Sequence, residues 1–218
     1  MKGRLASPGE RAPLVLRALA RSYPKADCEL DFKSPLELLV ATILSAQCTD
    51  ARVNLVTPAL FKKYRTARAY ASADQGELEG LVRSTGFFRN KARSIRLCCA
   101  ELVAKHKGQV PEEMDALTAL PGVGRKTANL VRAYAFGKPG IICDTHVLRV
   151  SARLGLASAK DPDKVEGELS ALVQKRDWTL FSTVLMWHGR RVCSARRPSC
   201  EACEVFSLCP FGQKAVDT

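Results

Sequence analysis

Residues 120–128, with the sequence Leu-Pro-Gly-Val-Gly-Arg-Lys-Thr-Ala, constrain the fold of this chain more than any other segment. Helical patterns run up to them and away from them, over residues 111–120 and 124–136, so only residues 121–123 separate two helices. A link this short forces the helices into a tight hairpin. Glycine suits such a turn because it adopts a positive φ at no steric cost and lets its backbone approach a ligand closely.

The start of the second helix of this hairpin is a candidate anion site. The first N–H groups of a helix have no acceptor within the helix, and the helix dipole adds positive potential there. The turn contains Gly122 and Gly124, and Arg125 and Lys126 follow directly. Successive N–H groups in such a turn form a concave phosphate site that is indifferent to base identity. We therefore expect the hairpin to hold a nucleic-acid backbone, although such a turn, taken alone, also occurs as an ordinary loop.

Helical periodicity dominates the rest of the chain as well, so we predict an all-α fold. Residues 36–47 are apolar nearly all round, which indicates a buried central helix after an N-cap at Ser34. Thr49 or Asp50 caps the next helix, and Pro58 within it predicts a kink or a break. Further helices are expected over residues 13–23, 74–85, 90–106, 144–154, 161–173 and 177–191.

The chain is strongly basic. Its 218 residues include 34 lysines and arginines against 22 acidic residues, which gives a formal net charge of +12. Such an excess predicts a polyanionic partner, with nucleic acid first and an acidic membrane surface second. No apolar run approaches the roughly 20 residues of a membrane span, and the N-terminal residues lack the apolar run of a signal peptide. We therefore expect a soluble, intracellular protein with no membrane partner.

The nine cysteines divide into two groups. Five are scattered through apolar or helical segments, whereas the other four crowd the last 26 residues. In a reducing compartment, clustered cysteines bind metal more often than they form disulfides. Four thiolates suit either tetrahedral zinc or a [4Fe–4S] cluster, so their chemistry alone leaves the metal open. The candidate ligands, separated by six, two and five residues, are Cys193, Cys200, Cys203 and Cys209.

A lysine and an aspartate are the main catalytic candidates. Asp144 follows Lys126 by 18 residues. A lysine amine is a nucleophile only when neutral, and the roughly 0.3–2 kcal/mol that a helix dipole supplies is too little to deprotonate it. Desolvation, or transfer of the proton to a neighbour such as Asp144, must supply the rest, and His146 is placed to orient that carboxylate. The alternative makes Lys126 a phosphate contact and Asp144 the N-cap of the next helix.

Residues 120–128 and Asp144 resemble the helix-hairpin-helix motif and the catalytic aspartate of the endonuclease III family of DNA glycosylases. Residues 45–50, residues 85–88 and the cysteine spacing are similar to segments of that family too, so the resemblance covers roughly residues 28–209. It implies two helical domains that flank a DNA-binding cleft. One is a six-helix barrel over residues 28–137, which carries the hairpin; the other joins residues 1–27 to residues 138–218 as an iron–sulfur cluster domain.

The resemblance also implies an activity and a cofactor. The chain would be a bifunctional DNA glycosylase and AP lyase of base excision repair, acting on double-stranded DNA that contains oxidised pyrimidines or abasic sites. Lys126 would attack the sugar C1′, form a Schiff base and nick the strand by β-elimination, while Asp144 activates the lysine and stabilises the developing positive charge. The four clustered cysteines would hold a structural [4Fe–4S] cluster, because every iron then has a protein ligand.

Family positions indicate how the enzyme would read DNA. A damaged base must leave the helix stack, and Gln47, Phe87 and Phe88 match positions that fill the gap. The family often has leucine and tyrosine where this chain has Phe87 and Phe88, and both rings also suit a local hydrophobic anchor. Arg196 and Arg197, in the loop between the first two cluster cysteines, are candidate phosphate contacts or a solvated loop. Further candidate phosphate contacts just beyond the phenylalanines are Arg89, Lys91 and Arg93.

Two other functions fit part of this pattern. Adenine-mismatch glycosylases resemble the chain in hairpin, aspartate and cluster, but they usually lack the lysine and carry an additional C-terminal domain. A non-catalytic helix-hairpin-helix module would explain the charge and the hairpin, but not Lys126 together with Asp144. We expect a monomer that acts at the nucleoid in the cytoplasm. Cys48 and Cys143 follow or precede predicted site residues, and each is a candidate for a reactive or an inert thiol.

Overall fold

The computed structural model describes residues 5–216, and within them it contains helices and turns but no strand. The predicted all-α fold class is confirmed. The chain divides into two compact units. One consists of Cys28–Lys138, and the other joins Met1–Asp27 to Pro139–Thr218. Each unit has a hydrophobic core of its own.

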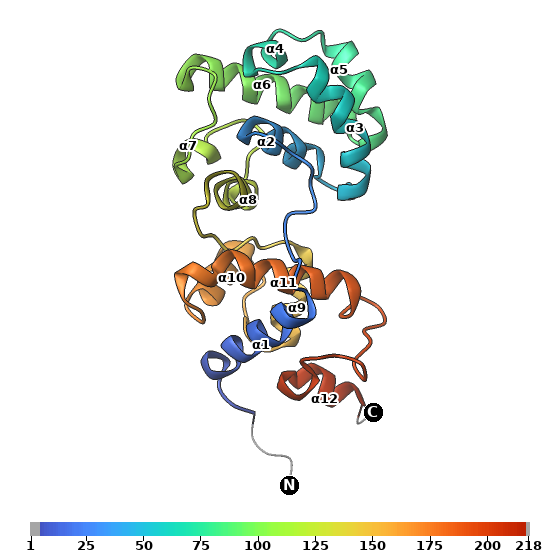
Figure 1. Ribbon diagram of the computed structural model, residues 1–218, viewed down its shortest axis with the longest axis vertical. Helices are drawn as coiled ribbons and strands as arrows, with labels where there is room; N and C mark the ends of the chain where they lie inside the picture. Colours follow the sequence, from blue (N-terminus) through green and yellow to red (C-terminus); the bar gives the residue numbers. More distant parts are fainter. Residues whose placement is uncertain (1–4, 217–218) are drawn as a thin grey trace. The chain divides into compact units, whose positions relative to one another are not determined.

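The Cys28–Lys138 unit is built around α2 (Figure 1). Leu38, Leu39 and Leu44 of this helix are completely buried, as its apolar sequence predicts. Helices α3, α6 and α8 pack against α2. The helices of this unit are α2 (Pro35–Leu44), α3 (Asp50–Lys63), α4 (Ala67–Ala71), α5 (Gln75–Val82), the 3₁₀ helix η1 (Arg83–Thr85), α6 (Phe88–His106), α7 (Met114–Thr118) and α8 (Arg125–Phe136).

Helix α3 runs without a break through Pro58, so of the kink or break expected there the break does not occur. Thr49, rather than Asp50, is its N-cap, and the Thr49 side chain accepts a hydrogen bond from the Arg52 N–H. A proline inside a helix removes one backbone hydrogen bond. Here Val53 and Leu60 are completely buried on either side of Pro58. Their burial against the core holds the helix together across the missing bond.

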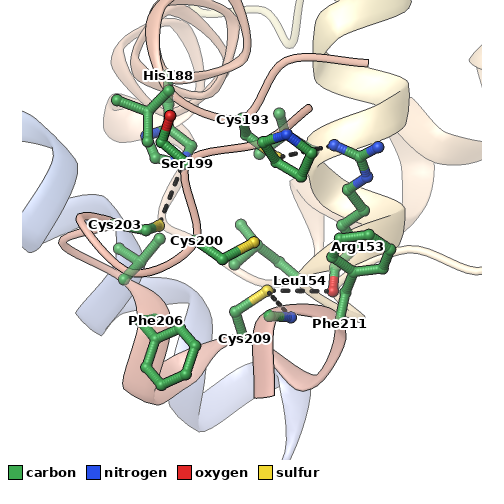
Figure 2. A pocket seen from close by; sticks show the side chains of 15 residues that line it. Arg153, Leu154, His188, Cys193, Ser199, Cys200, Cys203, Phe206, Cys209 and Phe211 are labelled. Atoms are coloured by element: carbon green, nitrogen blue, oxygen red, sulfur yellow. Dashed lines mark hydrogen bonds between the residues drawn. The ribbon is translucent and has the colours of Figure 1, made fainter. Parts of the chain in front are cut away.

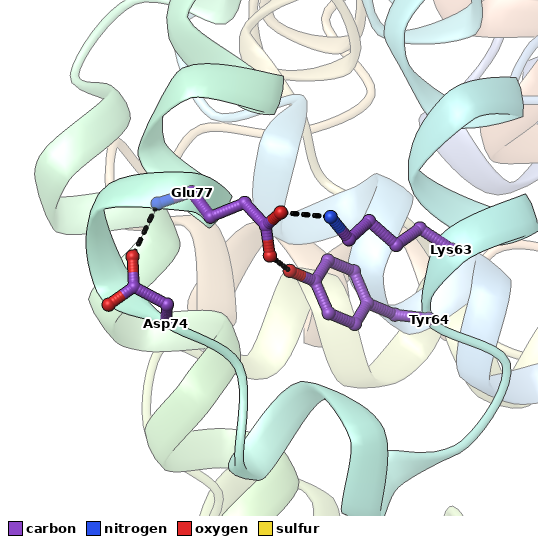
Figure 3. A network of polar contacts seen from close by, with 4 residues as sticks. All are labelled: Lys63, Tyr64, Asp74 and Glu77. Carbon is purple, nitrogen blue, oxygen red and sulfur yellow. Dashed lines mark hydrogen bonds and ion pairs between the residues drawn. The ribbon is translucent and has the colours of Figure 1, made fainter.

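Polar contacts of Glu77 join the end of α3 to the start of α5 (Figure 3). The Tyr64 hydroxyl donates to one Glu77 carboxylate oxygen at 2.8 Å, and the other oxygen is paired with the Lys63 ammonium. These two donors, Lys63 first, lower the pKa of Glu77. Asp74 caps α5 by accepting from the Glu77 N–H at 2.8 Å. The Lys63 and Glu77 side chains are about half exposed, so this network orders the surface more than it stabilises the fold.

The first helix of the hairpin, α7, is shorter than the helix expected over residues 111–120. Glu112 and Glu113 lie before it, outside the helix. The Glu112 carbonyl accepts from the Arg132 Nε at 3.0 Å, and both carboxylates pair with Lys138. Residues 112–113 are thus held by Arg132 of α8 and by Lys138, the last residue of the unit. These contacts explain why α7 begins only at Met114.

The second unit contains α1 (Pro8–Ser22), α9 (Thr145–Arg153), α10 (Pro162–Ser170), the 3₁₀ helices η2 (Lys175–Asp177) and η3 (Phe206–Leu208), α11 (Trp178–Arg191) and α12 (Pro210–Val216). Helix α1 begins earlier than the residue 13 expected for it, because Ser7 and Glu10 form a capping box. Pro13 therefore lies inside the helix, where it is exposed. Helices α1 and α9 both pack against α11.

A buried arginine ties α1 to the other helices of this unit. Arg11 is 5% exposed. Its guanidinium donates to the Leu208 carbonyl at 2.8 Å, to the Gly155 carbonyl at 3.1 Å and also to the Leu154 carbonyl. Carbonyls at the ends of helices lack partners within the helix, and a guanidinium supplies several donors in one plane. Arg11 thus closes the C-terminal end of α9 against α1.

Candidate functional site

The hairpin turn between α7 and α8 depends on Gly122. Its φ is +79°, in the left-handed region that favours glycine. A Cβ built at this position would lie 2.9 Å from the Cβ of Ser94 on α6. The turn is closed by the Val123 N–H, which donates to the Leu120 carbonyl at 3.1 Å. Backbone conformation and close packing therefore both require glycine here.

Gly124 leaves the start of α8 open. It is the N-cap of the helix, and no side chain caps the helix there. The first intrahelical bond runs from the Ala128 N–H to the Gly124 carbonyl at 2.9 Å, so the N–H groups of the preceding turn have no acceptor within the helix. A Cβ added to Gly124, unlike one added to Gly122, would meet no atom within 4 Å, so there is open space in front of the helix. This is the geometry of an anion site.

Lys126 lies at the second position of α8 and is exposed. Within the described residues it takes part in no hydrogen bond or ion pair. Its ammonium is therefore not committed to a structural contact of the fold. Arg125, one residue earlier, is exposed as well.

Two loops of the same unit hold the residues that match gap-filling positions. Gln47, between α2 and α3, has a φ of +52°, and Phe87, between η1 and α6, has a φ of +47°. Both residues are exposed, Phe87 by 63%. The left-handed region is unfavourable for residues with a side chain and is commonly occupied at functional sites. Phe88, by contrast, packs partly against the core as a hydrophobic anchor.

Lys91 is placed differently from the phosphate contact expected of it. The residue is 5% exposed, and its Nζ donates to the Thr85 carbonyl at 2.7 Å. Burial lowers the pKa of Lys91, an effect that the neighbouring Cys48 thiol opposes. Arg89 and Arg93, on the same helix, are exposed as expected. The sequence pattern could not separate them, because all three lie in one basic stretch.

In the other unit, Asp144 is the N-cap of α9. Its Oδ1 accepts from the Val147 N–H at 2.8 Å, and the residue is 7% exposed. The capping role considered for it from the sequence is therefore present in the structure, and it occupies one carboxylate oxygen. His146 does not orient it. The Nδ1 of His146 instead lies 3.1 Å from the Arg149 guanidinium, and no hydrogen bond joins His146 to Asp144 in the described part of the chain.

The four clustered cysteines line one pocket (Figure 2). The Sγ of Cys193 accepts from the Arg153 guanidinium at 3.3 Å, and the Sγ of Cys209 accepts from the Gly212 N–H at 3.3 Å. Hydrogen bonds of this kind stabilise thiolates that bind a metal. Cys200 and Cys203 are partly buried and close the pocket between η3 and the end of α11. The lining residues fit a metal centre with four thiolate ligands.

Only one of the cluster cysteines, Cys203, belongs to a compact group of potential metal ligands in the described residues. Tetrahedral zinc with Zn–S bonds of about 2.3 Å requires sulfurs only about 3.8 Å apart. In the described residues, one group of three potential ligand atoms lies within 4.8 Å of one another, and it consists of His188, Cys203 and Glu204. No three of the cluster cysteines form such a group there. His188 is completely buried, with Nδ1 3.1 Å from the Tyr23 hydroxyl and Nε2 3.5 Å from the Cys203 Sγ.

Arg153 was not identified from the sequence, yet it organises the loop that follows Cys193. Its guanidinium donates to the Ser194 carbonyl at 2.7 Å and to the Ala195 carbonyl at 2.8 Å. It also stacks over the Phe211 ring at 4.5 Å. The next two residues, Arg196 and Arg197, are exposed. An arginine on an amphipathic helix carries no sequence signal for such a role, because its partners are backbone carbonyls of a distant loop.

Burial distinguishes the other cysteines. Cys143 is 7% exposed, and burial raises its pKa to about 12, so its thiol is inert near neutral pH. Burial likewise raises the pKa of Cys98 to about 12. Cys48 is only partly buried. The thiol beside Asp144 is therefore a core residue.

Comparison with known proteins identifies the family. The HhH-GPD model, which describes a superfamily of base excision DNA repair proteins, matches residues 40–175. Endonuclease III of Synechocystis sp. is 52% identical to the chain and covers 96% of it and 96% of its own length. The chain belongs to the endonuclease III family. Endonuclease III of Escherichia coli K12 is 40% identical, covering 92% of this chain and 95% of its own.

Solved structures of endonuclease III with DNA match the fold closely. A trapped covalent endonuclease III–DNA intermediate has a TM-score of 0.92 and 45% identity over 95% of this chain and 98% of its own. A non-covalent endonuclease III–DNA complex matches with the same TM-score and identity over 96% and 99%. This member of the endonuclease III family is thus a DNA-binding enzyme of base excision repair, a DNA glycosylase with AP lyase activity. Among the helices of residues 5–216, none combines the length and the apolar character that crossing a membrane requires.

Proposed function

We propose that this chain removes oxidised pyrimidines from double-stranded DNA and then cleaves the strand, with Lys126 as the nucleophile. The observation that carries the proposal is the uncommitted, exposed Lys126 on the first turn of α8, directly after the open N-cap at Gly124. Phosphate bound at this helix start would bring the sugar of a neighbouring nucleotide near an amine. Family membership supports the same reaction class.

In the covalent steps the Lys126 amine is first the nucleophile and then the nitrogen of a Schiff base. The neutral Nζ attacks C1′, the C1′–N glycosidic bond breaks, and the base leaves with the bonding electron pair and takes up a proton. Ring opening then gives a Schiff base between Nζ and C1′. Loss of a proton from C2′ expels the 3′ phosphate by β-elimination, and water hydrolyses the Schiff base to free the lysine. The imine acts as the electron sink, so no external oxidant or reductant is needed.

In this proposal Asp144 supplies negative charge where positive charge develops on the sugar. It would also assist the deprotonation that Lys126 must undergo before attack. Only one oxygen of the Asp144 carboxylate caps α9. Capping and catalysis are therefore compatible, because each uses a different oxygen.

We further propose that Cys193, Cys200, Cys203 and Cys209 hold a [4Fe–4S] cluster. Their spacing along the chain is that of the family, and four thiolates can ligate every iron of such a cluster. A cluster ligated by four thiolates would cross-link residues 193–209 and fix the loop that carries Arg196 and Arg197. Those two arginines would then contact phosphates on the DNA backbone.

The remaining predicted DNA contacts belong to the same proposal. Gly122, Gly124 and Arg125 would hold the strand at the hairpin, while Gln47 and Phe87 fill the space that an extruded base leaves. Phe88 would support Phe87 from the core side. The hairpin unit would be the six-helix barrel domain, residues 28–137, and the remainder, residues 1–27 and 138–218, would be the cluster domain.

We also infer that the enzyme works as a monomer at the nucleoid in the cytoplasm, where its substrate lies. Sedimentation of the purified protein measures its molecular mass in solution and so tests whether it is a monomer.

Trapping with borohydride tests the proposal. Borohydride reduces a Schiff base to a stable amine, so incubation with abasic-site DNA should give a covalent protein–DNA adduct. Lys126→Ala should abolish the adduct, and Lys62→Ala, an exposed lysine of the same unit, should retain it. Persistence of the adduct in Lys126→Ala would assign the nucleophile elsewhere. Base release without any adduct would indicate a monofunctional glycosylase. If neither base release nor an adduct were observed, the chain would be a non-catalytic DNA-binding module.

A further inference from the structure

A buried lysine contacts the turn that presents Phe87. Lys91, one turn into α6, donates its backbone N–H to the Phe87 carbonyl at 3.1 Å. Its side chain folds back, and Nζ donates to the Thr85 carbonyl at 2.7 Å. One residue therefore binds the backbone on both sides of Gly86. Phe87 is 63% exposed, whereas Thr85, on the other side of Gly86, is 2% exposed.

The turn needs such support because its backbone is strained. Phe87 has φ and ψ of 47° and 28°, in the left-handed region, and Gly86 has φ and ψ of 70° and 157°, which only glycine adopts readily. Within the turn the Gly86 N–H reaches the Arg83 carbonyl at a long 3.4 Å. The buried Thr85 hydroxyl donates to the Val82 carbonyl at 2.8 Å, and the Lys91 ammonium adds a second short contact at the Thr85 carbonyl, the one that lies next to Gly86.

An ammonium is a costly way to fill a core position. Burial disfavours its charged form, which is why the pKa of Lys91 is lowered. An apolar side chain of similar length would pack there without this desolvation cost. The ammonium does what an apolar side chain cannot, because it satisfies a carbonyl at the C-terminal end of η1, where helix carbonyls lack partners.

We propose that Lys91 is a positioning residue for base extrusion, which acts by holding Phe87 in the conformation that enters DNA. The proposal rests on the function proposed above, in which Phe87 fills the space of the extruded base. Lys91 itself touches no DNA. Loss of its ammonium would free the backbone of residues 85–87, and Phe87 would spend most of its time in conformations that do not enter the stack.

A double-mutant cycle on base excision tests the proposal. Phe87→Ala, Lys91→Met and the double variant are compared in single turnovers on a duplex with a central thymine glycol. Each single variant should lose roughly tenfold in excision rate. The double variant should be no slower than Phe87→Ala, because the lysine acts only through the ring. Trapping on a preformed abasic site should change much less, since that substrate has no base to extrude.

Controls separate positioning from general destabilisation. Ile95→Val removes one buried methylene from the same helix and should leave excision unchanged at temperatures where it is folded. Lys91→Arg keeps a cationic donor and should recover part of the lost rate. Should Lys91→Met fail to fold, Lys91→Gln enters the same cycle.

Three results would overturn the proposal. Losses that multiply in the double variant would show that Lys91 acts independently of Phe87. Full activity of Lys91→Met would show that the ammonium is dispensable. Wild-type activity of Phe87→Ala would remove the ring from extrusion, yet it would leave the proposed function standing. Failure of the proposed function looks different, because the wild-type chain would then neither release thymine glycol nor form the borohydride adduct.

Discussion

Gly122 and Ser94 approach each other so closely that a Cβ on Gly122 would lie 2.9 Å from the Cβ of Ser94. The contact joins the hairpin turn to α6, the helix whose first turn carries Lys91 and follows Phe87. The hairpin turn and the Phe87 turn are thus both in contact with the N-terminal half of one helix.

Substitution of the two hairpin glycines should have different consequences. Gly122→Ala combines a positive φ with a steric clash, so it should lower the free energy of unfolding by about 1–3 kcal/mol. At Gly124 the φ is ordinary and an added Cβ would meet no atom within 4 Å, so Gly124→Ala should leave the free energy of unfolding nearly unchanged. It should weaken DNA binding, because the new methyl group would obstruct the approach of a phosphate to the N–H groups at the start of α8. Urea unfolding and a binding titration at fixed salt measure the two effects. Equal stability losses in both variants would contradict this assignment.

Asp144 offers a way to separate capping from catalysis. Asn is as good an N-cap as Asp, so Asp144→Asn should unfold at nearly the wild-type temperature. Its base-excision rate should nevertheless fall by at least roughly a hundredfold, because the carboxylate charge is lost. Asp144→Ala should lose the activity and also about 1 kcal/mol of stability. If Asp144→Asn kept the wild-type excision rate, the role of Asp144 would be limited to capping α9.

Removal of one cluster ligand should be visible in the absorption spectrum. Cys203→Ser should lose the brown colour of an iron–sulfur protein and lower the unfolding temperature, since a cluster contributes its binding free energy to the folded state. Cys48→Ser, which alters a cysteine outside the pocket, should keep the colour. Zinc without iron in the purified wild-type protein would refute the cluster.

Arg11 should prove important for stability. Arg11→Met leaves the carbonyls of Leu208, Gly155 and Leu154 without their buried donor, so the free energy of unfolding should fall by about 3 kcal/mol. Arg17→Met alters an exposed arginine of the same helix and should cost little. Thermal unfolding of both variants provides the comparison, and equal melting temperatures would contradict the role given to Arg11.

Cys143 should resist alkylation. Burial raises its pKa to about 12, so almost no thiolate is present at pH 8 and iodoacetamide should label it only in denaturant. Because the folded-state pKa lies above the unfolded value, this thiol's contribution to stability is complete below the unfolded pKa of about 8.5 and is lost as pH rises toward 12. Mass spectrometry of the labelled protein locates the modified cysteines. Rapid labelling of native Cys143 would contradict its burial.

The sequence by itself determined much of this enzyme. Long helical periods specified the all-α class, and the string around Gly122 and Gly124 specified the hairpin, because the short link and the two glycines are local properties. The four-cysteine spacing and the pairing of Lys126 with Asp144 pointed to the family through motifs that are read along the chain. These features depend on neighbours in sequence, so no three-dimensional information was needed.

Only the tertiary structure decided the roles of side chains whose partners are distant or are backbone groups. Lys91 and Arg93 look alike in sequence, but one is buried on the Thr85 carbonyl and the other is exposed. Arg11 and Arg153 bind carbonyls far away in the chain, and Pro58 remains helical because its neighbours are buried. The physical reason is common to all of them: burial and long-range hydrogen bonds are created by packing, and packing outweighs the local preferences that a sequence displays.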